Sequence, residues 1–165
     1  MRPATHPTAL RVQAAGRALG LDINVVEFEE STRTAEEAAS AVGCQVGQIV
    51  KSLVFTVAGE PVISLVSGSN RLDDRKLAGW AGIGRKKIKR GDADTVRIAT
   101  GYVIGGVAPF GYPQPLTVLC DEDLLKYDII WAAAGTPNAV FAVTPKALLM
   151  ATRATVVDLA QHGEG

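Results

Sequence analysis

The chain has 165 residues, of which 47% are apolar and 21% charged, with 17 basic and 17 acidic side chains. This composition predicts one soluble globular domain with a sizeable core, and no apolar run reaches the roughly 18 residues that a membrane-spanning helix needs. The first residues lack the apolar core of a signal peptide, and Cys44 and Cys120 have no CxxC spacing. We therefore expect a cytoplasmic protein with reduced thiols and neither a disulfide nor a metal site.

Helices and short strands alternate over the first half of the chain. In order, we expect a helix over 8–21, a strand over 23–28, a helix over 34–42 and strands over 49–57 and 62–66. Thr34 followed three residues later by Glu37 is a capping box, which marks the start of the second helix. The last two strands flank the turn sequence AGEP at 58–61, and this predicts a hairpin.

The second half continues the same mixture. We expect helices over 73–80 and from Asp92 or Asp94 to Gly101, strands over 102–104, 116–120, 129–133, 139–143 and 155–159, a helical turn over 121–125 and a helix opened by Thr144 and Pro145. Short links favour a largely antiparallel or mixed sheet, so the predicted fold is α+β, a single domain over 1–165 with its central sheet flanked by helices. Residues 1–20 are expected to form an N-terminal helical extension and residues 160–165 a frayed tail.

A lysine lies inside an apolar strand segment, IVKSLVF at 49–55. Because alternate residues of a strand share a face, Lys51 lies with Leu53 and Phe55 on what we predict to be the more apolar side. A lysine there is unfavourable unless it meets an anion or lines a wet pocket, whereas a lysine that reaches solvent from the start of the strand needs no function. We favour the first interpretation, with Lys51 as a functional residue.

A second unusual segment is the loop GGVAPFG at 105–111, which follows a predicted strand. Three glycines and a proline in seven residues make a rigid loop whose bare N–H groups a ligand can approach, although a tight structural turn has the same composition. No GK[ST] follows and no dinucleotide fingerprint is present, so neither of those phosphate sites is predicted. The loops SGSN at 67–70 and AGTPN at 134–138 are further candidate ligand contacts or ordinary turns.

Charge is unevenly distributed along the chain. Residues 70–90 contain eight basic residues opposed only by Asp73 and Asp74, so this window carries a formal charge of +6. Such a patch predicts an anionic partner, while a solvated lysine-rich turn is the alternative. Both histidines, His6 and His162, lie near the ends of the chain, so the predicted core lacks the commonest general base.

Four segments, taken in order, resemble the YbaK/ProX family of aminoacyl-tRNA deacylases: IVKSLVF at 49–55, SGSNRLD at 67–73, GYVIGGVAPFG at 101–111 and AGTPN at 134–138. This family is similar to the editing domain inserted in bacterial prolyl-tRNA synthetases, and the resemblance runs from about residue 21 to 159. It implies a free-standing hydrolase that acts on tRNA-Pro carrying a small wrong amino acid. The expected partner is the acceptor end of aminoacyl-tRNA, with no cofactor, and the resemblance leaves open a synthetase partner and a monomeric or dimeric state.

The resemblance also implies roles for individual residues. Catalytic roles fall on Lys51 and on the GxxxP loop at Gly105, Gly106 and Pro109, and substrate contacts on Ser67, Val107, Ala108, Phe110, Gly135, Thr136 and Asn138. Contacts with RNA are expected from Arg71, Arg85, Lys86, Lys87, Lys89 and Arg90. Backbone donors around the carbonyl, with water or a ribose hydroxyl handling the proton, make a catalytic histidine unnecessary.

Two other functions fit parts of the sequence. A non-catalytic module that binds an RNA end or a nucleotide beside a synthetase needs the basic window and stacking aromatic residues, of which the chain has nine in all. An unrelated small-molecule esterase needs a nucleophile with a base, and Ser67 and Ser69 have no histidine near them in sequence. The deacylase interpretation accounts for more of the motifs than either alternative.

Overall fold

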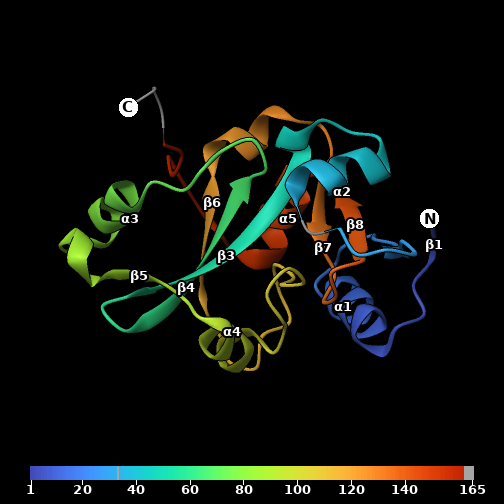
Figure 1. Ribbon diagram of the computed structural model, residues 1–165, viewed down its shortest axis with the longest axis horizontal. Helices are drawn as coiled ribbons and strands as arrows, with labels where there is room; N and C mark the ends of the chain where they lie inside the picture. The colour runs from blue at the N-terminus through green and yellow to red at the C-terminus, as the bar shows by residue number, and fades with distance from the viewer. Residues whose placement is uncertain (33, 162–165) are drawn as a thin grey trace.

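A nine-stranded mixed sheet runs through the computed structural model, which describes residues 1–32 and 34–161 (Figure 1). Its strands are β1 (Arg2–Pro3), β2 (Val26–Glu27), β3 (Ile49–Val57), β4 (Glu60–Ser67), β5 (Ile88–Arg90), β6 (Thr117–Asp121), β7 (Ile130–Ala133), β8 (Ala139–Val143) and β9 (Thr155–Val157). They follow the order β1-β2-β8-β7-β3-β4-β6-β9, and β5 pairs with β3 beside this path. The pairs β3–β7, β4–β6 and β6–β9 are parallel and the others antiparallel, so the predicted mixed sheet is confirmed.

Five α-helices flank this sheet within the described part of the chain. They are α1 (Pro7–Ala18), α2 (Ala35–Val42), α3 (Asp74–Ala81), α4 (Ala93–Thr100) and α5 (Pro145–Thr152), with the 3-10 turns η1 (Val46–Gln48), η2 (Arg85–Lys87) and η3 (Glu122–Lys126). The predicted caps are confirmed, because Thr34, Asp73, Asp92 and Thr144 each accept an N–H of the first helical turn. In Figure 1, α2 and α3 lie at opposite ends of the sheet.

The central strand β3 changes partners along one of its edges. On one side β4 pairs with it from Val50 to Val57. On the other side β7 pairs with it only at Ile49 and Val50, and β5 only from Phe55 to Val57. Within the described chain, residues 51–54 therefore have no strand partner on that side. The sheet opens here, and the candidate site lies at this opening.

The two faces of β3 pack differently. Val50 and Val54 belong to the main core, together with residues of α1, α4 and α5. On the opposite face a small cluster joins Ile49 to α2, and another joins Val57 to α3. Lys51 lies between these two clusters and is only half-buried. Our prediction that Lys51 lies on the more apolar face is therefore wrong, because α2 and α3 cover only the ends of that face.

The N-terminal helix is built into the core and is not an appendage. β1 pairs with β2, and Ala9 and Val12 of α1 are fully buried. The buried Glu27 carboxylate accepts hydrogen bonds from the N–H groups of His6 at 2.8 Å and Thr5 at 2.6 Å, and these bonds hold the pKa of that carboxyl below its usual value. This anchor fixes the start of α1, which in turn supports the loops of the site.

Local differences from the predicted elements have identifiable causes. Residues 102–104 form no strand, because Gly101 ends α4 in a left-handed conformation and the N–H of Tyr102 donates to Thr100 Oγ1 at 3.1 Å. The predicted strand over 23–28 shortens to β2, and the helical turn over 121–125 is η3. The predicted tail starts too early, since Ala160 is buried and bridges Leu72. Residues 162–165, with His162, lie outside the described residues.

Candidate active site

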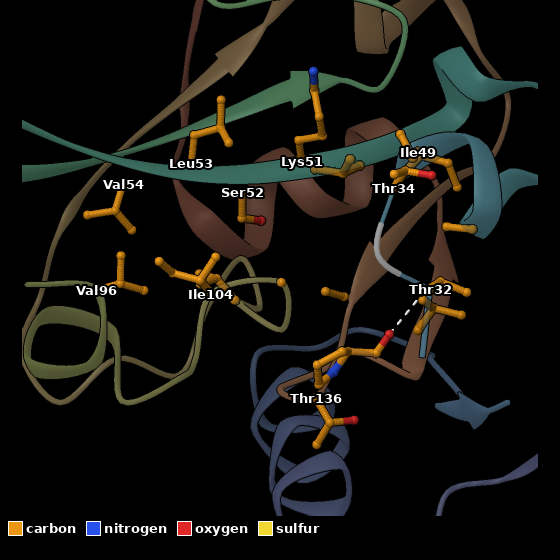
Figure 2. A pocket seen from close by; sticks show the side chains of 18 of the residues that line it. Thr32, Thr34, Ile49, Lys51, Ser52, Leu53, Val54, Val96, Ile104 and Thr136 are labelled. Carbon is orange, nitrogen blue, oxygen red and sulfur yellow. Dashed lines mark hydrogen bonds between the residues drawn. The ribbon is translucent and has the colours of Figure 1, made fainter. Parts of the chain in front are cut away.

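A hollow of about 260 Å³ opens at the unpaired edge of β3 (Figure 2). It is lined by residues 49–54 of β3, by Thr32, Thr34, Ala35 and Ala38, by Arg90, Gly91 and Val96, by Ile104, Gly105 and Val107, and by Trp131, Ala133, Thr136, Pro137, Ala139 and Val140. Among the described residues that line it, none carries a carboxylate or an imidazole. Because most of these side chains are apolar, the hollow suits a small group with few polar atoms.

Ser52 presents three polar groups at this hollow. Its Oγ is buried and has no hydrogen-bond partner in the part of the chain that the structure describes. Figure 2 shows the side chain pointing from β3 toward Ile104. The backbone N–H and C=O of Ser52 lie on the unpaired edge, because the C=O of Val54, two residues on, accepts from Gly91 on that side at 2.8 Å. Buried polar groups need partners, so Ser52 is suited to bind a ligand.

A glycine turn closes another side of the hollow. The N–H of Gly106 donates to the C=O of Val103 at 2.9 Å, which closes a four-residue turn. Gly105 has a φ of +90°, the value that the third position of a type II turn requires. A Cβ on Gly106 would lie 2.8 Å from backbone atoms of Gly135 and Thr136. The absence of a side chain therefore lets the two loops touch backbone to backbone.

Among the described residues, the N–H groups of five residues of this loop have no acceptor: Gly105, Val107, Ala108, Phe110 and Gly111. Gly105 and Val107 are the two of these that line the hollow. The adjoining side chains of Val103 and Ile104 are 51% and 56% exposed, so the turn lies at an open rim. The hollow is therefore bordered by unpaired backbone donors from both the glycine turn and β3.

The turn between β7 and β8 forms a further wall. Thr136 Oγ1 donates to Asn138 Oδ1 at 3.0 Å, and Asn138 Nδ2 donates to the C=O of Phe28 at 2.8 Å. Gly135 has a φ of +93°, and a Cβ there would lie 2.7 Å from the Thr8 side chain of α1. Thr136 lines the hollow with its hydroxyl turned toward Asn138, while Asn138 and Gly135 fix the turn against its neighbours.

Lys51 lies at the boundary between this hollow and the opposite face of β3. Figure 2 shows its side chain pointing away from Ser52 and Ile104, and its ammonium donates to the C=O of Asn70. Burial lowers the pKa of the Lys51 ammonium below its usual value. The nearby carboxylate of Glu36 opposes this shift, and the positive charge of Arg90 adds to it.

A wider hollow of about 570 Å³ lies on the outer face of β3. It is lined by Lys51, Leu53, Phe55, Arg71, Leu72, Asp73, Asp74, Arg90 and Gln161. Asp73 caps α3, and Asp74 forms an ion pair with Arg85 at 3.5 Å, so both carboxylates already have partners. Lys51, Leu53 and Arg90 line both hollows. The outer hollow, with three cations and two carboxylates in its lining, is therefore a cationic basin that adjoins the apolar hollow.

The structure brings only part of the predicted site together. Lys51, Gly105, Val107 and Thr136 line the inner hollow, with Gly106 packed just behind it. Phe110 does not line it, because its ring packs in the core against Phe141 with centroids 5.6 Å apart. Ala108 and Pro109 are buried in the loop, and the Oγ of buried Ser67 donates to the C=O of Gly47 at 2.6 Å.

The predicted RNA contacts divide into two groups. Arg71 and Arg90 line the outer hollow. Arg85, Lys86, Lys87 and Lys89 are exposed on η2 and β5 and line neither hollow. The basic window therefore forms a surface that extends from the cationic basin.

Sequence reasoning missed Ser52, Thr32 and Trp131 as lining residues. A signal for Ser52 was available, since it is a polar residue between Val50 and Val54 on one face of an apolar strand. Within residues 1–32 and 34–161, no group of three or more His, Cys, Asp or Glu side chains is placed to hold a metal ion. No helix over the same residues is long and apolar enough to cross a bilayer.

Known proteins resemble this chain in sequence and in fold. The family model of the aminoacyl-tRNA editing domain matches residues 29–151. A crystal structure of a candidate trans-editing enzyme for prolyl-tRNA synthetase is 48% identical, with a TM-score of 0.90, and the match covers 96% of this chain and 100% of that one. The uncharacterised protein YwhH of Bacillus subtilis (strain 168) is 35% identical over 126 residues, 76% of this chain and 78% of its own length.

Two further relatives carry functional names. EbsC of Enterococcus faecalis (strain ATCC 700802 / V583), named as a candidate Cys-tRNA(Pro)/Cys-tRNA(Cys) deacylase, is 29% identical over 134 residues, 80% of each protein. A proline–tRNA ligase of Maridesulfovibrio salexigens is 37% identical over 102 residues, 62% of this chain but only 17% of the ligase. The resemblance predicted from the four sequence segments is confirmed: the chain belongs to the aminoacyl-tRNA editing domain family.

Proposed function

We propose that this chain hydrolyses the ester bond between a small, wrongly attached amino acid and tRNA, with tRNA-Pro as its main substrate. The observation that carries this proposal is the pair of adjoining hollows that share Lys51 and Arg90. An aminoacylated tRNA end has two matching parts, a small amino acid and a phosphate-bearing nucleotide. The names of the relatives, a candidate trans-editing enzyme for prolyl-tRNA synthetase and a candidate Cys-tRNA(Pro) deacylase, support this assignment.

The inner hollow receives the amino acid. Its apolar walls, such as Ile104, Val107 and Trp131, suit a side chain with few polar atoms, such as that of alanine, cysteine, serine or threonine. A methylene group is worth about 1–3 kcal/mol in such a pocket, which is why a synthetase alone selects poorly among small side chains. The Ser52 hydroxyl adds one polar contact.

Backbone donors polarise the ester carbonyl. Water adds to the carbonyl carbon, the ester C–O bond breaks, and the ribose oxygen leaves with a proton. In this proposal the N–H groups of Gly105 and Val107, which line the hollow and have no acceptor among the described residues, stabilise the negative charge that develops on the carbonyl oxygen. We assign the proton relay from water to the leaving oxygen to the neighbouring ribose hydroxyl, which the substrate itself supplies beside the ester.

The outer hollow holds the tRNA end. Lys51, Arg71 and Arg90 supply the positive charge for the terminal phosphates. The exposed cations of η2 and β5 extend this contact along the RNA backbone, where binding depends on charge and not on sequence. Lys51 therefore orients the substrate at the junction between its nucleotide and its ester.

The test is deacylation of tRNA-Pro charged with alanine, cysteine, serine, threonine or proline. We expect hydrolysis of at least one wrong pair and no hydrolysis of the prolyl ester. Lys51→Ala should reduce turnover by about 100-fold, the loss expected when the reacting group is misplaced by about 1 Å. Lys146→Ala is the matched control, an exposed lysine of α5 that lines neither hollow. Binding of tRNA without turnover of any ester would instead indicate a non-catalytic binding module.

A further inference from the structure

The carbonyl that accepts from Lys51 belongs to a tightly held residue, Asn70. Asn70 Nδ2 donates to Oδ2 of Asp121 and to Oδ2 of Asp123, both at 2.8 Å. The N–H of Asn70 donates to the C=O of Ser67 at 2.9 Å. Because Lys51 donates to the C=O of Asn70, one residue links the lysine to two carboxylates.

The first of these carboxylates is an anchor within the sheet. Asp121 ends β6 and is fully buried. Its Oδ2 also accepts from the N–H of Ser67 at 3.1 Å, and its Oδ1 accepts from the N–H of Asp123 at 3.0 Å. A buried carboxylate with several donors has little freedom to move. The position of Asn70 is therefore set by β6 and β4, which pair directly.

The hydrogen bond from Lys51 to the C=O of Asn70 matters because charged groups of both signs surround the ammonium. Arg90 and Arg71 line the same basin and repel the ammonium, whereas Glu36 and Asp121 attract it. The lysine side chain has four rotatable bonds and is only half-buried. Because charges of both signs act on it, the ammonium has no single electrostatic position, and a fixed acceptor is what can hold it at the junction of the hollows.

We infer that Asn70, clamped by Asp121 and Asp123, is a positioning residue that holds the Lys51 ammonium at the junction of the two hollows. This inference rests on the proposed role of Lys51 in deacylation. Asn70 has no contact with the inner hollow, so its effect on the reaction passes through Lys51. The assignment predicts that the two residues behave as one unit in kinetics.

The test is a double-mutant cycle with Asn70→Ala, Lys51→Ala and the double variant. Asn70→Ala keeps the backbone carbonyl but removes both contacts of the clamp. We expect it to lower kcat/KM about tenfold in the wild type and less than about twofold in the Lys51→Ala background. A merely structural role would lower kcat/KM equally in both backgrounds. Asn24→Ala is the matched control, since this exposed asparagine accepts a hydrogen bond from Arg17 and lines neither hollow.

A second variant guards against misfolding. Asp123→Ala removes one contact of the clamp and leaves Asp121 in place, and we expect about a threefold loss that is again absent without Lys51. Full activity of Asn70→Ala, or a loss that repeats in the Lys51→Ala background, would overturn the inference while leaving deacylation intact. A wild-type protein that hydrolyses no charged tRNA, or a fully active Lys51→Ala variant, would overturn the proposed function or the role of Lys51, and this inference with it.

Discussion

One strand separates two hollows of opposite character. The inner hollow of about 260 Å³ is mostly apolar and bordered by unpaired backbone donors, whereas the outer one of about 570 Å³ contains three cations. Ser52 and Lys51 are neighbours in β3, and their side chains point to opposite faces: Ser52 lines only the inner hollow, whereas Lys51 lines both. Under the proposed function, this difference predicts that recognition of the amino acid and recognition of the tRNA end can be altered separately.

The activity that depends on the inner hollow should be lost when the glycine turn and the turn at 134–138 are forced apart. A Cβ on Gly106 would lie 2.8 Å from the backbone of Gly135 and Thr136, and backbone cannot rotate away as a side chain can. We expect Gly106→Ala to reduce deacylation by at least about 100-fold, since displacements near 1 Å have effects of that size. Binding of tRNA-Pro, measured by filter retention, should stay within about twofold because the outer hollow is untouched.

Gly84→Ala is the matched control for this change. A Cβ at Gly84 meets no atom within 4 Å, so both activity and binding should match the wild type. An active Gly106→Ala variant would show that close contact between the loops is not required for the reaction.

A change in the outer hollow should weaken tRNA binding and leave turnover unchanged. Arg71→Ala removes one cation from the basin and leaves the inner hollow intact. We expect tRNA binding to weaken about tenfold at low salt, and the slope of log affinity against log salt to fall by about one. Turnover at saturating tRNA should be unchanged. Arg11→Ala on α1, which lines neither hollow, should leave the salt slope as it is.

Sequence patterns correctly predicted those structural features that depend on residues close together in the chain. Helix caps such as Thr34 and Asp92 and the hairpin of β3 and β4 follow from neighbouring residues, and so were predictable. The exchange of partners along β3 depends on β5 and β7, which are distant in sequence, so the face of Lys51 was assigned wrongly. No sequence pattern around β3 predicts that the edge of the sheet is unpaired at residues 51–54.

The glycine loop shows the same limit. Its contact with the turn at 134–138 was not predictable, although both segments were recognised as candidates. Phe110 was expected to face the substrate, but the Tyr102 hydroxyl donates to its C=O at 2.8 Å and its ring fills the core beside Phe141. The sequence around an aromatic residue next to glycines is the same whether its ring faces a ligand or the core, so the two cases cannot be distinguished from sequence.

A smaller change should sharpen the role of the inner hollow. Ser52→Ala removes a buried hydroxyl that has no partner among the described residues, so the free energy of unfolding should not fall. We expect the preference among alanyl, cysteinyl and seryl esters to change about three- to tenfold. Ser64→Ala is the control, because its hydroxyl is also buried and unpartnered there but lines neither hollow. Equal substrate preferences in the two variants would remove Ser52 from selection.

The smallest expected effect concerns pH and the outer hollow. Burial lowers the pKa of Lys51 from its usual 10.5, so the folded chain binds this proton less tightly than the unfolded chain does. Folding stability should therefore rise slightly as pH increases from the lowered pKa toward 10.5, and Lys51→Ala should abolish the rise. If the charged form orients the substrate, kcat/KM should decrease as pH rises. This decrease should begin at a lower pH than the one at which an ordinary lysine loses its proton. Because arginine stays charged, Lys51→Arg should lack this alkaline fall once spontaneous ester hydrolysis is subtracted. If kcat/KM of Lys51→Arg still decreases at alkaline pH, the titrating group is not Lys51. The charge of Lys51 on the outer face of β3 would then not be required for the reaction.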